Sequence, residues 1–148
     1  MKRLTFFLLL TILVGLLGCE QSVKKRPIGW LKLGKISELM VPETFLQDKR
    51  ILVRFEEGGF TAMSTECTHD LTPLKLVETP NGKEFHSEYT SSRYDARGHV
   101  LSGPSKANLP FYFLKFDSES YGGAVNTLYV EIGVEKPESW KLSLRPPA

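Results

Sequence analysis

The stretch STECTHDLTPL, residues 64–74, decides how this chain is interpreted, because it sets Cys67 and His69 two positions apart between two predicted β-hairpins. Each hairpin consists of two apolar or alternating runs joined by a turn sequence, EEGG in the first and PNG in the second. The paired runs are Ile51–Phe55 with Phe60–Ser64, and Leu74–Thr79 with Lys83–Ser87. Cys67 and His69 are therefore expected on a loop that follows a strand.

The rest of the chain repeats this strand-and-turn pattern. From Ile28 onward, turn signals recur about every ten residues, a spacing typical of an all-β sandwich or barrel. Further predicted strands are His99–Ser102, Phe111–Asp117, Leu128–Gly133 and Trp140–Leu144, of which Phe111–Asp117 and Leu128–Gly133 are expected to pair. Beyond residue 18, no stretch shows a helical period over three turns. The sequence predicts one all-β domain.

The chain begins with a cationic and then apolar segment. Met1-Lys2-Arg3 precedes Leu4–Gly18, in which every residue is apolar, glycine or threonine. As a helix this run would span only roughly 22 Å, less than the ~30 Å hydrocarbon core of a bilayer, so a secretory signal is expected. It ends in Leu16-Leu17-Gly18-Cys19, which resembles the lipobox of bacterial lipoproteins. That resemblance implies that Cys19 is acylated and becomes the mature N-terminus.

Cleavage before Cys19 changes the charge of the chain. It leaves 148 − 18 = 130 residues and removes Lys2 and Arg3, so that 19 basic side chains become 17 against 17 acidic ones. This balance argues against binding to nucleic acid. The expected partner is membrane lipid, bound through acylated Cys19 on the periplasmic or cell-surface face, with a polar tether that ends in Lys24-Lys25-Arg26. A disulfide between Cys19 and Cys67 is not expected.

Several short motifs in order resemble a Rieske iron–sulfur domain over roughly Ile28 to Glu135. They are WLKLGKISEL at 30–39, Cys-x-His at 67–69, YDARG at 94–98, SGP at 102–104, LP at 109–110 and LYV at 128–130. The resemblance implies a Rieske-like antiparallel sandwich or incomplete barrel with two ligand-type loops. The expected divisions are a signal peptide at 1–18, a lipid-anchored tether at 19–27, a Rieske-like domain at 28–135 and a C-terminal extension at 136–148.

The resemblance also implies a [2Fe–2S] cluster, which the family holds with two Cys and two His from Cys-x-His and Cys-x-x-His-Gly-Ser loops. Cys67 and His69 occupy the first pair of positions. Alignment of the second loop puts Ser87 at the Cys position and Thr90 at the His position. Half of the ligand set is therefore absent, because neither hydroxyl is a good substitute for thiolate or imidazole.

Other residues do not complete the set. His86 precedes the second-loop position by one residue and is expected on the opposite sheet face, and His99 falls on a predicted strand beyond the loop. Ser92 and Tyr94 align with family residues that donate hydrogen bonds to a bridging sulfide and to a cysteine sulfur; alternatively, both simply hold the loop. His69 is the one neighbour in sequence expected to lower the pKa of Cys67.

Three functional interpretations remain open at this point. The first is a Rieske-like domain without a conventional cluster, acting as a binding or structural subunit of a membrane redox system and having no activity of its own. The second is an electron-transfer Rieske protein, an oxidoreductase subunit with a non-standard ligand set. The third is a mononuclear metal site at Cys67 and His69, completed by His86.

Overall fold

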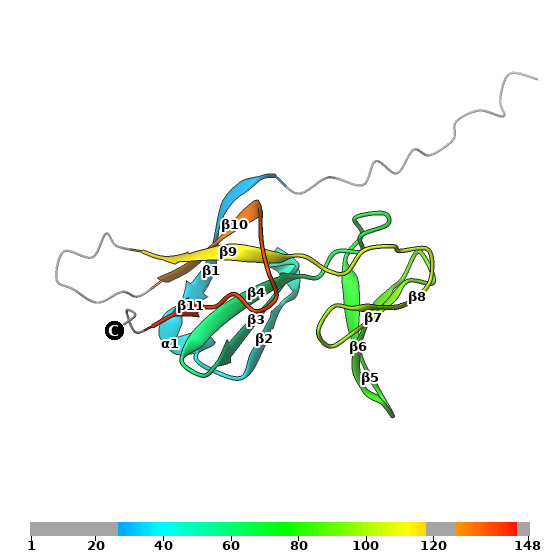
Figure 1. The fold of residues 1–148 in the computed structure, drawn as a ribbon, viewed down its shortest axis with the longest axis horizontal. Helices are drawn as coiled ribbons and strands as arrows, with labels where there is room; N and C mark the ends of the chain where they lie inside the picture. Colours follow the sequence, from blue (N-terminus) through cyan, green and yellow to red (C-terminus); the bar gives the residue numbers. More distant parts are fainter. Residues whose placement is uncertain (1–26, 118–126, 145–148) are drawn as a thin grey trace, which may run out of the picture.

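Two antiparallel sheets make up the computed structural model, which describes residues 27–117 and 127–144 (Figure 1). The larger sheet has the order β1-β10-β9-β4-β3-β2, with β11 pairing with β4, and the smaller has the order β5-β6-β7-β8. The larger contains β1 (Gly29–Lys35), β2 (Glu43–Leu46), β3 (Ile51–Glu56), β4 (Gly59–Ser64), β9 (Phe111–Phe116), β10 (Thr127–Lys136) and β11 (Leu142–Ser143). The smaller contains β5 (Leu74–Thr79), β6 (Gly82–Ser87), β7 (Arg93–Asp95) and β8 (Val100–Ser102).

Both predicted hairpins and the predicted all-β class are confirmed. β3 pairs with β4 through Phe55 and Phe60, and β5 pairs with β6 through Leu74 and Ser87. The first turn is tight because Glu57 and Gly58 both adopt positive φ, 53° and 75°, as the commonest two-residue hairpin turn requires. The predicted pairing of Phe111–Asp117 with Leu128–Gly133 is found as β9 with β10.

Some boundaries differ from the sequence-based expectation. The predicted strand Trp140–Leu144 shortens to β11, because a turn hydrogen bond from the Trp140 N–H to the Pro137 carbonyl (2.9 Å) precedes it. β11 lies in the segment assigned above to a C-terminal extension, and it pairs with β4 of the larger sheet. The short helix α1 (Ile36–Leu39) and the 3₁₀ turn η1 (Gln47–Lys49) were not anticipated, since neither is long enough to show a period.

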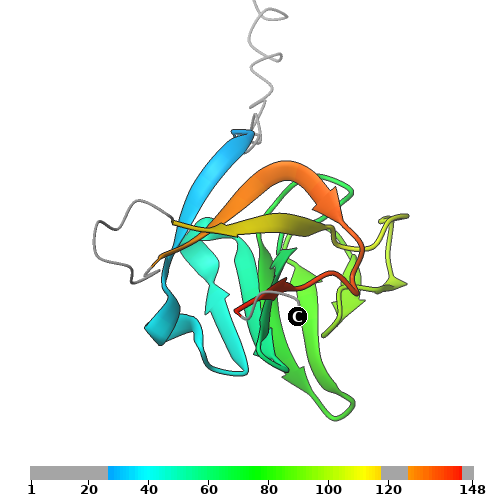
Figure 2. The same cartoon turned by 60° about the vertical axis from the view of Figure 1, so that its left-hand side comes forward.

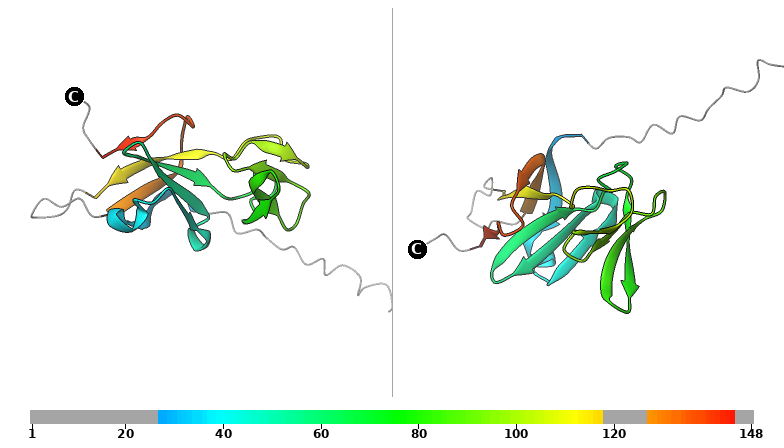
Figure 3. Two further views of the ribbon diagram at one scale, coloured as in Figure 1. Left: turned by 90° about the horizontal axis from the view of Figure 1, so that it is seen from below. Right: turned by 45° about the vertical axis from the view of Figure 1, so that its right-hand side comes forward.

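The described residues form two hydrophobic cores. The larger sheet curls around a core that includes Phe60, Leu114 and Val130, none of which is exposed (Figure 2). The second core, with Phe85 and Tyr94, lies between the smaller sheet and β3, β4 and β9. The smaller sheet is therefore an insertion between β4 and β9 that packs beside the larger sheet (Figure 3).

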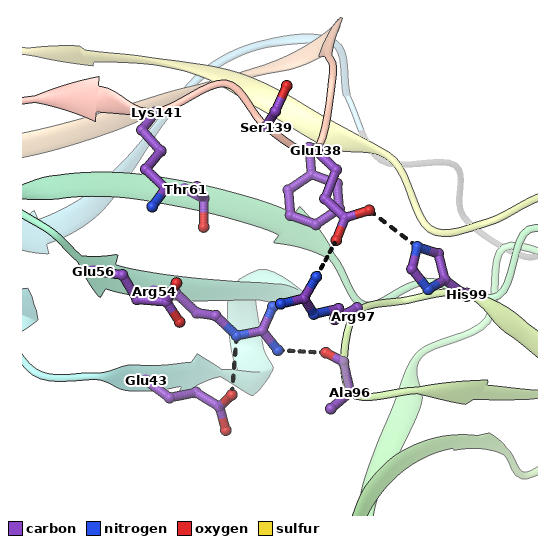
Figure 4. Close-up of a pocket in the computed structure, with 11 residues that line it drawn as sticks. Glu43, Arg54, Glu56, Thr61, Ala96, Arg97, His99, Glu138, Ser139 and Lys141 are labelled. Atoms are coloured by element: carbon purple, nitrogen blue, oxygen red, sulfur yellow. Dashed lines mark hydrogen bonds and ion pairs between the residues drawn. The ribbon is translucent and has the colours of Figure 1, made fainter.

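A charged cleft of about 710 Å³ lies where the two sheets meet (Figure 4). Arg54 of β3 crosses it, with its guanidinium bonded to Glu43 (3.2 Å) and to the Ala96 carbonyl. Glu138, in the segment after β10, bonds to His99 (3.0 Å) and lies 3.6 Å from Arg97. These contacts attach the segment between β7 and β8 to the larger sheet.

Helices in the described residues are too short and polar to cross a membrane. The proposed signal segment and Cys19 lie outside the described residues.

The His99 contact predicts a pH-dependent stability. The hydrogen bond to Glu138 raises the pKa of His99 above its ordinary value of 6.5, partial burial opposes this, and Asp95 adds to it. The stabilisation is complete below about pH 6.5 and is lost as pH rises through the raised pKa. Because the pair is largely exposed, we expect less than about 1 kcal/mol.

Urea unfolding below and above this range measures the effect. Glu138→Gln should reduce the loss of stability on going to higher pH, whereas Glu56→Gln, at another residue lining the same cleft, should leave it unchanged. An equal pH dependence in wild type and Glu138→Gln would contradict the assignment.

Candidate functional site

Three loops meet at one end of the smaller sheet. The first loop, residues 65–73, follows β4; the second, 88–92, joins β6 to β7; the third, 103–108, follows β8. In the first loop, the Cys67 N–H donates to the Thr72 carbonyl and the Leu71 N–H donates to the Cys67 carbonyl, both at 2.8 Å. This backbone closure turns the Cys67 side chain inward, where it is fully buried, and leaves His69 exposed.

The second loop is closed by its own hydroxyls. Ser87 Oγ accepts hydrogen bonds from the N–H groups of Tyr89 (3.2 Å) and Thr90 (3.1 Å), which is the arrangement of a serine-stabilised turn. Thr90 Oγ1 donates to Ser92 Oγ (3.0 Å) and accepts from the Ser92 N–H (3.2 Å). The side chains at both expected second-loop ligand positions therefore make hydrogen bonds within the loop.

The third loop packs directly against the second. Gly103 has a φ of 95°, and a Cβ at this position would lie 2.5 Å from backbone atoms of Ser91 and Ser92, so only glycine permits the approach. Ser105, two residues later, is buried, and its hydroxyl donates to Ser92 Oγ at 2.9 Å. Sequence reasoning identified the Gly103-Pro104 turn but not Ser105; the turn was the one signal that could have pointed to it.

Tyr94 connects all three loops. Its hydroxyl accepts from the Thr68 N–H (3.0 Å) in the first loop and donates to Ser105 Oγ (2.6 Å) in the third. The same oxygen lies 3.6 Å from Cys67 Sγ, so its single proton can be donated to either Ser105 or Cys67. Through Ser105 the chain of contacts continues to Ser92. We call Thr68, Thr90, Ser92, Tyr94 and Ser105 the hydroxyl network.

The hydroxyl network sets the electrostatics of Cys67. Burial raises the pKa of the Cys67 thiol, but contacts with the Ser105 hydroxyl, the His69 backbone N–H and the Tyr94 hydroxyl outweigh burial, so the pKa is lowered overall. The contribution of His69 to this shift comes from its backbone N–H. Burial raises the pKa of Tyr94, which keeps its hydroxyl protonated and able to donate at neutral pH.

The other histidines are engaged elsewhere. His86 of β6 bonds to Glu84 (2.8 Å), which also binds Arg93, and His99 bonds to Asp95 (3.1 Å). Within residues 27–117 and 127–144, no three His, Cys, Asp or Glu side chains are grouped closely enough to hold a metal ion. In the structure, Cys67, Ser92 and Tyr94 lie around the Ser105 hydroxyl, and Thr90 is attached through Ser92.

Removal of the Tyr94 hydroxyl should loosen the first loop. In Tyr94→Phe, the Thr68 N–H loses its acceptor and Ser105 loses a donor, so we expect unfolding to become about 1–3 kcal/mol easier. The more specific result is faster hydrogen exchange at the Thr68 amide. Tyr89→Phe, at a tyrosine that is 68% exposed, is the control and should change neither. Unchanged protection of Thr68 in Tyr94→Phe would contradict the proposed link.

Comparisons with known proteins identify the family of this chain. The model of the Rieske [2Fe-2S] domain matches residues 29–113, which is more than half of the chain. No curated protein matches. Among solved structures, the crystal structure of the cyanobacterial plasma membrane Rieske protein PetC3 from Synechocystis PCC 6803 is 20% identical, with a TM-score of 0.41, and the match covers 68% of this chain and 98% of that one. The chain belongs to the Rieske [2Fe-2S] domain family.

Proposed function

We propose that this protein is a lipid-anchored extracytoplasmic Rieske-like protein that works without a conventional [2Fe–2S] cluster. Its role is that of a binding or structural subunit beside a membrane redox system, and it has no catalytic activity of its own. The anchor is the acylated Cys19, and the tether is residues 19–27.

The donor set does not fit the cluster that the family implies. Such a cluster takes two thiolates and two imidazoles, whereas this chain offers one of each at the aligned positions, Cys67 and His69. Serine binds iron well only as an alkoxide, and Ser87 Oγ already accepts two backbone N–H bonds in its turn. Thr90 has no imidazole nitrogen to offer, and its hydroxyl is bonded to Ser92.

One observation carries the proposal: the Ser92 and Ser105 hydroxyls are 2.9 Å apart and join the second loop to the third. Together with Tyr94, they also join both loops to the first, through the Thr68 N–H. Buried hydroxyls that satisfy one another in this way hold the loops in place with protein groups alone. These contacts support the proposal that the loops keep their arrangement without a metal.

The retained loops present a surface for a partner. Leu71 in the first loop is 39% exposed, Tyr89 in the second is 68% exposed, and His69 in the first is also exposed. Leu71 also has a φ of 60°, a strained conformation for a leucine. Exposed aromatic and aliphatic side chains on ordered loops favour contact with another protein. The partner class is a subunit of a membrane redox complex.

Metal analysis tests the cluster-free assignment. Anaerobically produced residues 20–148 should be folded and colourless, with iron and acid-labile sulfide far below one cluster per chain. Stoichiometric iron and sulfide would overturn the assignment and would establish electron transfer with a non-standard ligand set. A single metal ion per chain, lost in Cys67→Ala, would instead establish a mononuclear site.

The double variant Ser87→Cys with Thr90→His tests the loop alignment. It should gain iron, and a folded double variant that still excludes iron would count against the alignment.

Site-specific cross-linking tests the partner role. A photo-crosslinking amino acid at Tyr89, in the full chain expressed in its native membranes, should give a discrete adduct with one redox-complex subunit. The same group at Asn81, in the exposed turn at the other end of the β5–β6 hairpin, is the matched control and should give none. Equal adducts at both positions, or none at either, would contradict the proposed surface.

A further inference from the structure

The outer face of β1, β10 and β9 carries aromatic and basic side chains in two rows. The strand register aligns Trp30, Glu131 and Phe113 in one row. It aligns Lys32, Tyr129 and Lys115 in the next. Residues at the alternate positions, such as Leu31, Val130 and Leu114, point to the opposite side and pack in the larger core. We call Trp30, Lys32, Phe113, Lys115, Tyr129 and Glu131 the outer face.

The rings and ammonium groups of the outer face interleave. The Lys115 ammonium lies 4.0 Å from the centre of the Trp30 ring and 5.9 Å from that of Tyr129. Trp30 and Phe113 meet edge to face with their centres 6.0 Å apart. Figure 2 shows the three strands side by side along one margin of the molecule. Both lysines on this face are exposed.

Exposed apolar groups mark the beginning of β1. Ile28, just before the strand, is 76% exposed, and Trp30 is 43% exposed. Ile28 packs beside Gly133 on the same face, with a methyl group 3.0 Å from where a Cβ would stand. An isoleucine and a tryptophan exposed together beside two lysines are the residue types of an interfacial membrane contact, in which the rings lie at headgroup level and lysines reach phosphates.

The number of residues between Cys19 and β1 limits how far the outer face can lie from the lipid anchor. Residues 20–28 lie between Cys19 and Gly29. A fully extended chain covers at most about 3.3–3.6 Å per residue, so the beginning of β1 stays within roughly 36 Å of an acyl anchor at Cys19. The segment also contains Lys24, Lys25 and Arg26, which favour an anionic surface.

We propose that the outer face docks on the surface of an anionic bilayer. Ile28 and Trp30 enter the boundary between headgroups and acyl chains, and Lys32 and Lys115 contact lipid phosphates. Glu131, the one acidic residue of the face, lies between Trp30 and Phe113 in the register, and with the two lysines it leaves a formal charge of +1 on the face. The inference rests on the proposed lipid anchor for proximity, while the face itself is a property of the folded domain.

Tryptophan quenching by brominated lipid tests the docking. The full chain, produced with its own signal segment, is reconstituted in vesicles of phosphatidylglycerol and brominated phosphatidylcholine, and Cys19 is checked separately by mass spectrometry. Trp30 and Trp140 are the two tryptophans of the chain, so Trp140→Phe isolates Trp30. Its emission should shift to shorter wavelength and be quenched. The control combines Trp30→Phe, Trp140→Phe and Leu101→Trp, which moves the probe to exposed β8, and it should show neither change.

The charge requirement is tested with matched variants. Lys32→Gln with Lys115→Gln, in the Trp140→Phe background, should lower the ratio of docked to undocked protein by roughly 30-fold, about fivefold for each charge removed. Replacing phosphatidylglycerol by a zwitterionic lipid should act in the same direction. Lys75→Gln with Lys106→Gln removes the same charge from the smaller sheet and the third loop, and should leave quenching unchanged.

The outcomes separate the face from the anchor. If Cys19 is acylated and the protein floats with vesicles, but Trp30 is not quenched, the docking proposal is wrong and the anchor stands. If Cys19 carries no acyl chain, the anchor proposal fails; quenching of Trp30 by anionic vesicles then still supports the face, and its absence overturns it. Equal quenching of Trp30 and the β8 probe would also overturn it. The docking proposal would also be overturned if the emission of Trp30 shifted in native membranes but not in vesicles, because that result would indicate a protein partner.

Discussion

The hydrogen bond from Tyr94 to Ser105 is the contact on which the loop end of this protein depends. It is short, 2.6 Å, and both side chains are buried. Tyr94 is held by the second core on one side and accepts the Thr68 N–H on the other, while Ser105 reaches Ser92. Removal of the Tyr94 hydroxyl would take the acceptor from the Thr68 N–H and a donor from the buried Ser105 hydroxyl, which costs more than one bond contributes. The three loops therefore form one unit because their buried hydroxyls require one another.

The same contact shapes the environment of the single thiol in the domain. Cys67 Sγ is 3.4 Å from Ser105 and 3.6 Å from Tyr94, inside a core whose other members are mostly apolar. The surrounding donors lower its pKa although burial opposes them. The alignment of Tyr94 with a family tyrosine implies that family members use a hydrogen-bond donor at this position to tune the cluster. Here we propose that it holds loops whose outer surface contacts a partner.

Much of the fold could be predicted from sequence because local patterns determine it. The Glu57-Gly58 turn and the alternation in Phe111–Phe116 identified the β3–β4 hairpin and the β9–β10 pair. Ser105 could not be identified as a site residue, because its role depends on contacts with residues 11 and 13 positions away and on Gly103 packing against Ser91. Likewise, the rows of the outer face appear only once β1 is placed beside β10, far away in the sequence.

We propose that protein hydroxyls, rather than a metal cluster, hold the three loops together. A crystal structure of the protein purified anaerobically, with anomalous data recorded at the iron absorption edge, would distinguish the two. We expect no iron peak among the loops, and Ser92 and Ser105 within hydrogen-bond distance of each other. Iron peaks beside Cys67 and His69, with the two serine hydroxyls separated, would contradict it.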